Sequence, residues 1–281
     1  MQAMDELTSH SRVAVIHLSN FGCGADSFII HFLRQRRKNT PFLELEIDEH
    51  SEFTGIGTRL EAFIYSSNTK NMPSLKKTLP SAELLGKPKN DRKLLIPQMS
   101  DHAFAFSAAF QSYGVNAEVL PLPDEESILL GKQSVAGGEC LPCSLVIGDM
   151  LKYLKYHSNE LSAPEFFMIS GDGPCRLGQY PYLQRLVLDE NGFNDVSIFD
   201  ASQNQNFYEK FDIVPNSFKR KVWQGVVATD ILFRKWRECR PYSNEKKICD
   251  KIYREEIEKI CKGDQENGKL SIQLRKAFDR F

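Results

Sequence analysis

The sequence contains no apolar run long enough to span a membrane. No stretch of its 281 residues approaches 18 consecutive apolar side chains, and the polar segment 1–11 lacks the apolar core of a secretory signal. The chain also lacks a strong net charge, because 36 basic residues face 37 acidic ones. A near-neutral chain gives no global field that attracts nucleic acid or an anionic membrane. We therefore expect a soluble, cytoplasmic protein without nucleic-acid or membrane partners.

Two further patterns that would fix a function are missing. No Gly-Lys-Ser or Gly-Lys-Thr follows a glycine-rich loop, and the loop Gly171–Gly178 has four residues between its second and third glycines, where the dinucleotide fingerprint has two. We expect no nucleotide bound to this chain. The seven cysteines are an odd number in a chain without a secretory signal. This disfavours a disulfide framework and favours metal binding or catalysis.

The apolar pattern alternates between short strand-like runs and amphipathic helices. Strands are expected at 13–18, 42–47, 93–96, 117–120, 166–169 and 196–199, and helices at 25–33, 54–66, 101–112, 125–132, 142–156 and 177–191. This alternation is typical of an α/β fold with Rossmann-like parallel-sheet lobes whose faces are covered by helices. The expected division is a first lobe in 1–66, a linker or surface loop in 67–92, a second lobe in 93–204 and a mostly helical C-terminal region in 205–281. The charged stretch 244–281 is expected to pack loosely.

Three loops place a cysteine where the chain turns into a helix: Phe21–Gly24, Glu139–Cys143 and Gly173–Arg176. Free N–H groups and the helix dipole stabilise a thiolate at such a position, which makes it a better metal ligand or nucleophile. In a parallel sheet, these loops lie near the carboxyl ends of strands, where ligands bind. The three loops therefore predict a shared site made by Cys23, Cys140 and Cys175. The other three cysteines outside these loops are interpreted as ordinary thiols: Cys239, Cys249 and Cys261.

Three chemistries are compatible with this set of cysteines. Structural zinc could be held by four thiolates, but zinc sites are usually built from local knuckles, and these ligands span about 150 residues. An iron–sulfur cluster needs a similar set of thiolates and uses amide donors of the kind that helix N-termini supply, so we favour it over zinc. The segment Cys140–Cys143 also has the spacing of a dithiol redox motif. The residues before it are turn-like, however, whereas a thioredoxin-like site follows a strand.

Two further groups are candidates for a role beside the cysteines. Glu46 and His50 belong to an acidic cluster at the end of the second expected strand, suited to general acid–base chemistry or to hydrogen bonding around a site. Arg176 directly follows Cys175 and can pair with an anionic cluster or substrate. The alternatives are a solvated loop and a surface arginine. Arg176, Glu46 and His50 are the candidate catalytic residues.

Several motifs, found in the same order over residues 11–245, resemble one known family. It is the 2-hydroxyacyl-CoA dehydratase family, and within it the activase-related proteins, also described as CoA-substrate-specific enzyme activase-like. The chain is similar only to the dehydratase-like C-terminal part of those polypeptides. The motifs are His17–Phe28, Glu44–Ser51 with Thr58–Phe63, Glu139–Cys143 with Gly148–Lys152, and Gly173–Tyr180 with Leu183–Leu188.

The resemblance implies an iron–sulfur protein of stacked flavodoxin-like lobes, with Cys23, Cys140 and Cys175 as cluster ligands and Cys143 as a fourth candidate. In dehydratase members, an ATP-hydrolysing activase of the actin and sugar-kinase type injects one low-potential electron into a 4Fe-4S cluster. The electron passes to a 2-hydroxyacyl-CoA thioester, and the resulting ketyl radical expels hydroxide. Other relatives carry a double-cubane cluster and reduce other small molecules. The family therefore implies anaerobic electron transfer, an activase partner and an acyl-CoA substrate.

Family polypeptides usually carry activase modules and a second dehydratase-like segment upstream of the region matched here. This chain contains neither, so the resemblance also implies an upstream dehydratase-like subunit as a partner. Three hypotheses follow. The chain is a lyase-type or reductase-type iron–sulfur subunit, a non-catalytic module that holds a cluster or zinc for electron transfer or docking, or a CxxC thiol–disulfide oxidoreductase.

Overall fold

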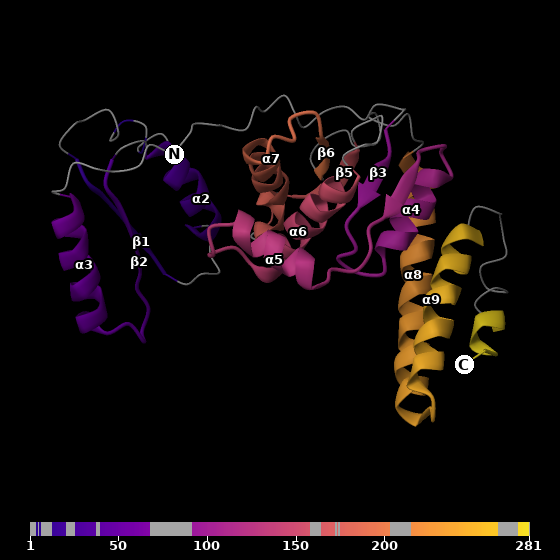
Figure 1. Ribbon diagram of the computed structural model, residues 1–281. Helices are drawn as coiled ribbons and strands as arrows, with labels where there is room; N and C mark the ends of the chain where they lie inside the picture. The colour runs from indigo at the N-terminus through magenta and orange to yellow at the C-terminus, as the bar shows by residue number, and fades with distance from the viewer. Residues whose placement is uncertain are drawn as a thin grey trace.

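The computed structural model describes residues 4, 6, 13–20, 26–37, 40–67, 92–157, 164–171, 173, 175–202, 215–263 and 275–280. This part of the chain is an α/β fold with two parallel sheets, as the sequence predicts (Figure 1). Among the helices within these residues, none combines the length and the apolar character that crossing a membrane requires.

The N-terminal sheet has two parallel strands, β1 (Val15–Ser19) and β2 (Phe42–Glu46). The crossover between them is α2 (Asp26–Arg36), and α3 (Phe53–Ser67) follows β2 without burying any side chain. Two strands are too few for a stable sheet on their own. The contacts that α2 makes with the rest of the protein therefore matter for the stability of this unit.

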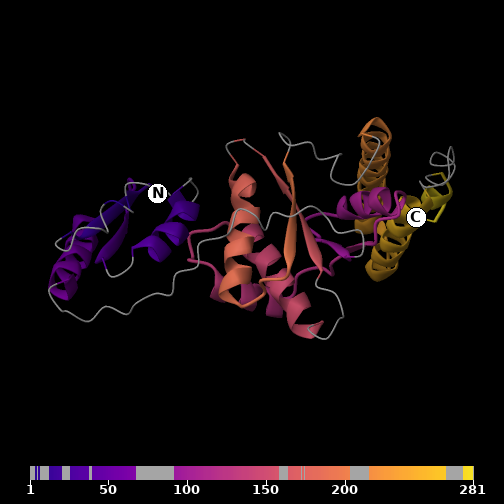
Figure 2. The ribbon, with the colours of Figure 1, turned by 90° about the horizontal axis from the view of Figure 1, so that it is seen from above.

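The second sheet has four parallel strands in the order β4-β3-β5-β6. In Figure 2 it lies in the middle of the molecule, between the N-terminal unit and the C-terminal helices. Its strands are β3 (Leu94–Ile96), β4 (Ala117–Val119), β5 (Glu165–Ser170) and β6 (Ser197–Ser202). The helical segments between and after them are α4 (Ala103–Gln111), α5 (Glu125–Ser134), α6 (Leu141–Tyr156), the short 3-10 helix η2 (Arg176–Gln179) and α7 (Tyr180–Glu190).

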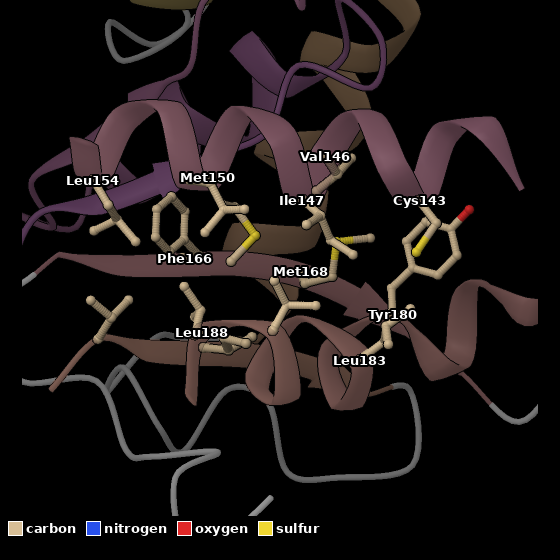
Figure 3. Packing of buried hydrophobic residues seen from close by; sticks show 14 of the residues in the cluster. Cys143, Val146, Ile147, Met150, Leu154, Phe166, Met168, Tyr180, Leu183 and Leu188 are labelled. Carbon is tan, nitrogen blue, oxygen red and sulfur yellow. The ribbon is translucent and has the colours of Figure 1, made fainter. Parts of the chain in front are cut away.

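Both faces of this sheet are covered by helices. Because strand side chains alternate, Phe166 and Met168 pack on one face against α6 and α7 (Figure 3), while Phe167 packs on the opposite face with α4. Strands buried on both faces read as continuous apolar runs, which explains why β5 is visible in the sequence as Phe-Phe-Met-Ile. The three layers bring the loops after the strands, including the one that leads to Cys175, to one edge.

Helices α5 and α6 approach one another until their backbones touch. A Cβ atom on Gly148 would lie 1.8 Å from the Ser127 carbonyl oxygen, and one on Gly131 would lie 1.9 Å from the Ser144 carbonyl oxygen. Asp124 caps α5 by accepting a hydrogen bond from the Ser127 amide at 3.1 Å. These contacts fix α6 against α5 and so fix the position at which α6 begins, directly after Cys140.

The described residues of the C-terminal region are mainly helical, as expected, and include α8 (Pro215–Cys239), the 3-10 helix η4 (Arg240–Tyr242) and α9 (Lys246–Gly263). The expectation of loose packing is wrong for its described residues. Tyr253, Ile257 and Ala277 are buried in a cluster with Ala228 and Leu232 of α8. The apolar residues of α9 recur every four positions, which gives this charged helix a buried stripe.

The expected strands and helices occur within three residues of their predicted bounds, with one exception. The helix expected at 177–191 is divided into η2 and α7. The division follows a close contact, because a Cβ on Gly178 would lie 2.1 Å from the Gly171 carbonyl oxygen. Most of the linker expected at 67–92, from 68 to 91, lies outside the described residues, and the three domain boundaries remain predictions.

The α5–α6 contact gives a test of this packing. We expect Gly148→Ala to lower the free energy of unfolding by about 1–3 kcal/mol, because the new methyl group must push two backbones apart. Gly57→Ala in α3 is the matched control, since its Cβ would meet no atom within 4 Å and alanine favours helix by about 1 kcal/mol. Urea denaturation followed by circular dichroism measures both, and equal effects of the two substitutions would contradict the proposed contact.

Candidate functional site

The described cysteine loops open helices, as the sequence predicts. Cys140 is the N-cap of α6, with φ −67° and ψ 147°, and Cys143 lies in the first turn of that helix. Cys175 precedes η2 in an extended conformation, with φ −73° and ψ 134°. Cys23, the remaining predicted ligand, lies outside the described residues.

Tyr180, the first residue of α7, contacts Cys140 and lies beside Cys143 (Figure 3), and the charge of Cys175 also acts on it. The Cys140 sulfur and the Tyr180 hydroxyl are hydrogen-bonded at 2.7 Å. Burial raises the pKa of Tyr180, and this hydrogen bond and the negative charges of the thiolates of Cys140, Cys143 and Cys175 raise it further. Segments about 35 positions apart in the chain therefore meet at one phenol.

The three thiols differ in exposure. Cys143 has 0% of its surface exposed and lies in the apolar cluster of α6 and α7, next to Tyr180 (Figure 3). Burial raises the pKa of the Cys143 thiol, and the negative charges of Cys140 and Glu139 add to this effect, while Arg176 opposes it. Cys140 is half-buried and Cys175 is exposed. Cys140 and Cys175 are thus the thiols that a ligand can reach without rearranging the core.

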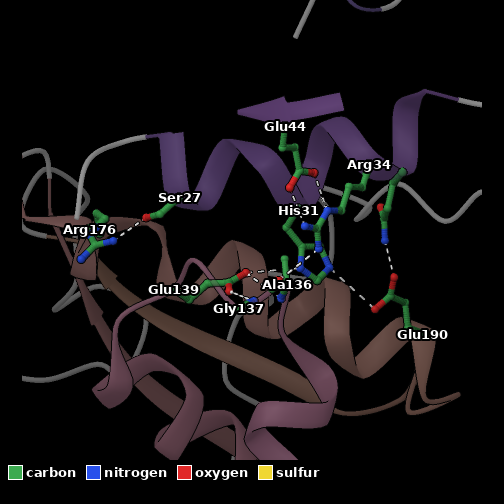
Figure 4. A network of polar contacts seen from close by, with 10 residues as sticks. Ser27, His31, Arg34, Glu44, Ala136, Gly137, Glu139, Arg176 and Glu190 are labelled. Carbon is green, nitrogen blue, oxygen red and sulfur yellow. Dashed lines mark hydrogen bonds and ion pairs between the residues drawn. The ribbon is translucent and has the colours of Figure 1, made fainter. Parts of the chain in front are cut away.

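The start of α2 docks on the same place. The Arg176 guanidinium donates a hydrogen bond to the Ser27 hydroxyl (Figure 4) and lies 5.7 Å from the centre of the Phe28 ring. The Phe28 ring in turn stacks on Tyr180, with ring centres 5.8 Å apart. Ser27 and Phe28 follow Cys23 by four and five positions in the sequence. The helix that comes after Cys23 is therefore anchored to Tyr180, the partner of Cys140, and to Arg176, which directly follows Cys175.

A buried ion pair holds α2 in this position. His31 Nδ1 lies 3.4 Å from Glu139 Oε1, and the Glu139 side chain is 0% exposed. Glu139 also accepts hydrogen bonds from the backbone amides of Ala136 and Gly137, at 3.1 Å and 2.9 Å. Burial favours protonated Glu139, but His31 and the backbone amides outweigh it and lower the pKa of the carboxyl.

Contacts of His31 and of Arg34 extend this pair into a network. His31 Nε2 lies 3.8 Å from Glu190 Oε2 at the end of α7 (Figure 4). Arg34 binds the Glu44 carboxylate through two hydrogen bonds of 2.5 Å each and donates a third, of 3.1 Å, to the Ala136 carbonyl. The network joins α2 and β2 to the segment before Cys140 and to α7.

The three candidate catalytic residues are placed differently. Arg176 lies beside the cysteines, half-buried between Ser27 and Phe28. Glu46 ends β2 opposite Ser19, where the chain leaves β1 toward Cys23, and it is exposed. The side chain of His50 is 85% exposed, 3.8 Å from Glu49. Glu46 and His50 thus lie at the carboxyl edge of the N-terminal sheet, as solvated groups.

Sequence reasoning missed the polar residues that support the cysteine loops. Tyr180, His31 and Glu139 act through contacts between distant segments, which no local pattern announces. Gln184 was also missed. It lies one turn after Tyr180 in α7, is 1% exposed, and has no hydrogen-bond partner for either amide atom within the described part of the chain. The sequence did contain a sign of this residue, which is a glutamine inside the apolar run of α7. An unpaired buried amide costs stability, so a glutamine at a buried position calls for an explanation.

The donor chemistry fits a thiolate-bound group better than a harder ion. The groups gathered at the centre of the site are sulfur atoms, which suit zinc and iron–sulfur clusters. Among the described residues, no group of three or more histidine, cysteine or acidic side chains has an arrangement that could hold a metal ion. That search includes Cys140, Cys143 and Cys175 but not Cys23, so the predicted ligand set is not assembled within the described residues.

Comparison with protein-family models, with curated proteins and with solved structures finds no match for this chain. The functional argument therefore depends on the residues of the chain itself.

The His31 network predicts a pH dependence of stability. Burial alone would lower the pKa of His31, but Glu139 and Glu190 overcome it and raise the pKa from 6.5 to about 9. A raised histidine pKa stabilises the fold below pH 6.5, and this contribution, about 3 kcal/mol, is lost as the pH rises to about 9. We expect His31→Gln to have a lower free energy of unfolding at pH 6 than the unsubstituted protein. We also expect its free energy of unfolding to fall much less between pH 6.5 and 9.

The control is His50→Gln, since the His50 side chain is 85% exposed. Urea denaturation of the three proteins at several pH values measures the effect. If the free energy of unfolding of His31→Gln and that of the unsubstituted protein change in parallel with pH, His31 is not held in its charged form.

Proposed function

We propose that this chain is an iron–sulfur protein related to the 2-hydroxyacyl-CoA dehydratases. In this proposal it accepts low-potential electrons from an ATP-hydrolysing activase and uses them to dehydrate or reduce an acyl-CoA-type substrate. The proposed ligands are Cys23, Cys140 and Cys175, with Cys143 as a fourth. The observation that carries the proposal is the hydrogen bond between Cys140 and Tyr180, a side chain on which the charges of Cys143 and Cys175 also act.

Two groups next to the thiols support this assignment. The Arg176 guanidinium supplies positive charge near Cys143, which opposes the effect of burial on the pKa of that thiol. The Tyr180 hydroxyl can donate its hydrogen bond to the Cys140 sulfur, and hydrogen bonds to sulfur tune the reduction potential of a cluster. When bound, a 4Fe-4S or double-cubane cluster supplies one-electron transfer. Free thiols of this kind persist in the reducing cytoplasm, where we place the protein.

The candidate catalytic residues take separate roles in this proposal. Arg176 neutralises negative charge at the cysteines. Glu46 and His50, exposed at the carboxyl edge of the N-terminal sheet, exchange protons with solvent or with a substrate that enters there. An upstream dehydratase-like subunit is the partner that would cover that edge.

The cluster is tested by anaerobic reconstitution with iron and sulfide. We expect the protein to bind both in similar amounts and to show an EPR signal after reduction. Cys23→Ser, Cys140→Ser and Cys175→Ser should each lose most of the bound iron, because each removes a thiolate ligand. Cys239→Ser on α8 is the control and should retain it. Protein without iron and sulfide, or the same iron content in Cys140→Ser and Cys239→Ser, would rule the cluster out.

Activity is measured with the reconstituted chain, an activase, ATP and a reductant. Turnover of a 2-hydroxyacyl-CoA supports the catalytic form of the proposal. A cluster that the activase reduces without turnover would instead support a non-catalytic electron-transfer or docking module.

A second candidate function is thiol–disulfide exchange, and one observation favours it. Cys140 is half-buried at the start of α6, whereas Cys143 three residues later is fully buried with a raised pKa. A dithiol site needs one accessible thiol that attacks the substrate and one nearby thiol that resolves the mixed disulfide. The Cys140 thiolate attacks a substrate disulfide, which releases one substrate thiolate and leaves the other half bound to Cys140 as a mixed disulfide. Cys143, after losing its proton, then attacks the Cys140 sulfur, which releases the second substrate thiolate and forms the Cys140–Cys143 disulfide.

The two candidates differ in their dependence on Cys175. For a dithiol site, Cys140→Ser and Cys143→Ser should each abolish reduction of a disulfide substrate by dithiothreitol-regenerated protein, and Cys175→Ser should leave the rate unchanged. Metal content should be the same in all of them. Loss of exchange activity in Cys175→Ser, or activity that survives Cys143→Ser, would contradict the dithiol mechanism.

A further inference from the structure

A cavity of about 430 Å³ lies between the second sheet and the C-terminal helices, and no residue of the cysteine site lines it. Gln98 and Asp101 enter it from the loop after β3, and Leu122 enters it from the loop after β4. Helices α8 and α9 close the opposite side. The cavity therefore stands at the carboxyl ends of parallel strands, where α/β proteins bind ligands, and its volume suits a small molecule.

One wall of this cavity is aromatic. The Trp236 and Tyr253 rings are stacked with centres 5.1 Å apart, and Phe233 lies 5.5 Å from Trp236. The outer side of this cluster already holds cations, with the Arg240 guanidinium 5.5 Å from the Trp236 ring and that of Arg237 5.5 Å from the Phe233 ring. Electron-rich ring faces attract positive charge, so the wall favours a cationic ligand over an anionic one.

The polar groups of the cavity also favour a positively charged ligand. The Asp101 carboxylate accepts hydrogen bonds from Gln98 Nε2 at 3.0 Å and from the Tyr253 hydroxyl at 2.8 Å. Both donors are neutral, and no cation pairs with Asp101 in the described part of the chain. Its negative charge is thus held in place without a counter-charge, and a carboxylate has further lone pairs to offer.

The other charged side chains at the cavity do not cancel the negative charge of Asp101. Asp250 accepts hydrogen bonds from Trp236 Nε1 at 2.8 Å and from Arg240 Nε at 2.7 Å, so its charge is matched by Arg240. Glu258 and Arg254 line the cavity with opposite charges. Together with Arg240 these charged groups sum to one negative charge, and Asp101, whose hydrogen-bond donors are both neutral, faces a space lined largely by aromatic and aliphatic side chains.

We propose that this cavity binds a small organic ammonium ion that carries an apolar arm. The ammonium group donates hydrogen bonds to Asp101, and the arm lies against Phe233, Tyr253 and the aliphatic residues Leu122 and Ile257. This site is independent of the cysteines and of the proposed cluster.

The test uses three probes that share one arm and differ in charge: 2-phenylethylammonium, 2-phenylethanol and phenylacetate. The protein carries Trp223→Phe, which leaves Trp236 as the single tryptophan, because the chain has two and Trp223 is 68% exposed on α8. Trp236 fluorescence and calorimetry both report binding. We expect the ammonium ion to bind about tenfold more tightly than the alcohol, and phenylacetate to bind most weakly.

Asp101→Asn identifies the recognition group. It should reduce the preference for the ammonium ion over the alcohol to near unity and leave binding of the alcohol unchanged, which also shows that the cavity is intact. Glu238→Gln on α8, whose carboxylate pairs with Arg234 and lies outside the cavity lining, should keep the full preference.

Three results would overturn the proposal. They are equal binding of the ammonium ion and the alcohol, tightest binding of phenylacetate, which would assign recognition to Arg254, and no saturable binding of any probe at millimolar concentration. The comparison among the three probes holds without any substitution at Asp101, so it stands even where Asp101→Asn fails to fold.

Discussion

The buried pair of His31 and Glu139 is the constraint on which the rest of the structure depends. A carboxylate with 0% exposure is stable only when its charge is fully matched, and Glu139 achieves this with one imidazolium and two backbone amides. Removing one partner of such a pair typically costs 3–5 kcal/mol, because the other charge stays buried alone. Since His31 belongs to α2 and Glu139 directly precedes Cys140, the same pair positions the N-terminal sheet and the first cysteine loop.

Most of the fold could be predicted from the sequence because the helices and strands are local patterns. The alternation of apolar runs predicted both ends of β5 and of α6 to within one residue of their observed positions. The division between η2 and α7 could not be predicted, because it follows from the contact of Gly178 with the Gly171 carbonyl rather than from periodicity. The packing of α9 was missed because its charged residues outnumber the few that form its buried stripe.

The site was less predictable than the fold. The cysteine loops were visible as turns that open helices, and Cys140 and Cys175 occupy those positions. Cys143 could have been recognised as a buried residue, since it precedes Ile147 and Met150 on the inner stripe of α6. The contacts of Tyr180 and His31 join segments far apart in the chain, and no single-sequence pattern encodes such pairs.

The polar contacts of α2 and those of the second sheet share one property, which is a large separation along the chain. The hydrogen bond from Arg34 to Ala136 joins residues 102 positions apart, and the one from Arg92 to the Asp195 carbonyl joins residues 103 positions apart. Such contacts close long loops, whose entropy cost must be met before they add stability. A fold held by contacts of this kind is expected to form more slowly than a helical bundle of the same length.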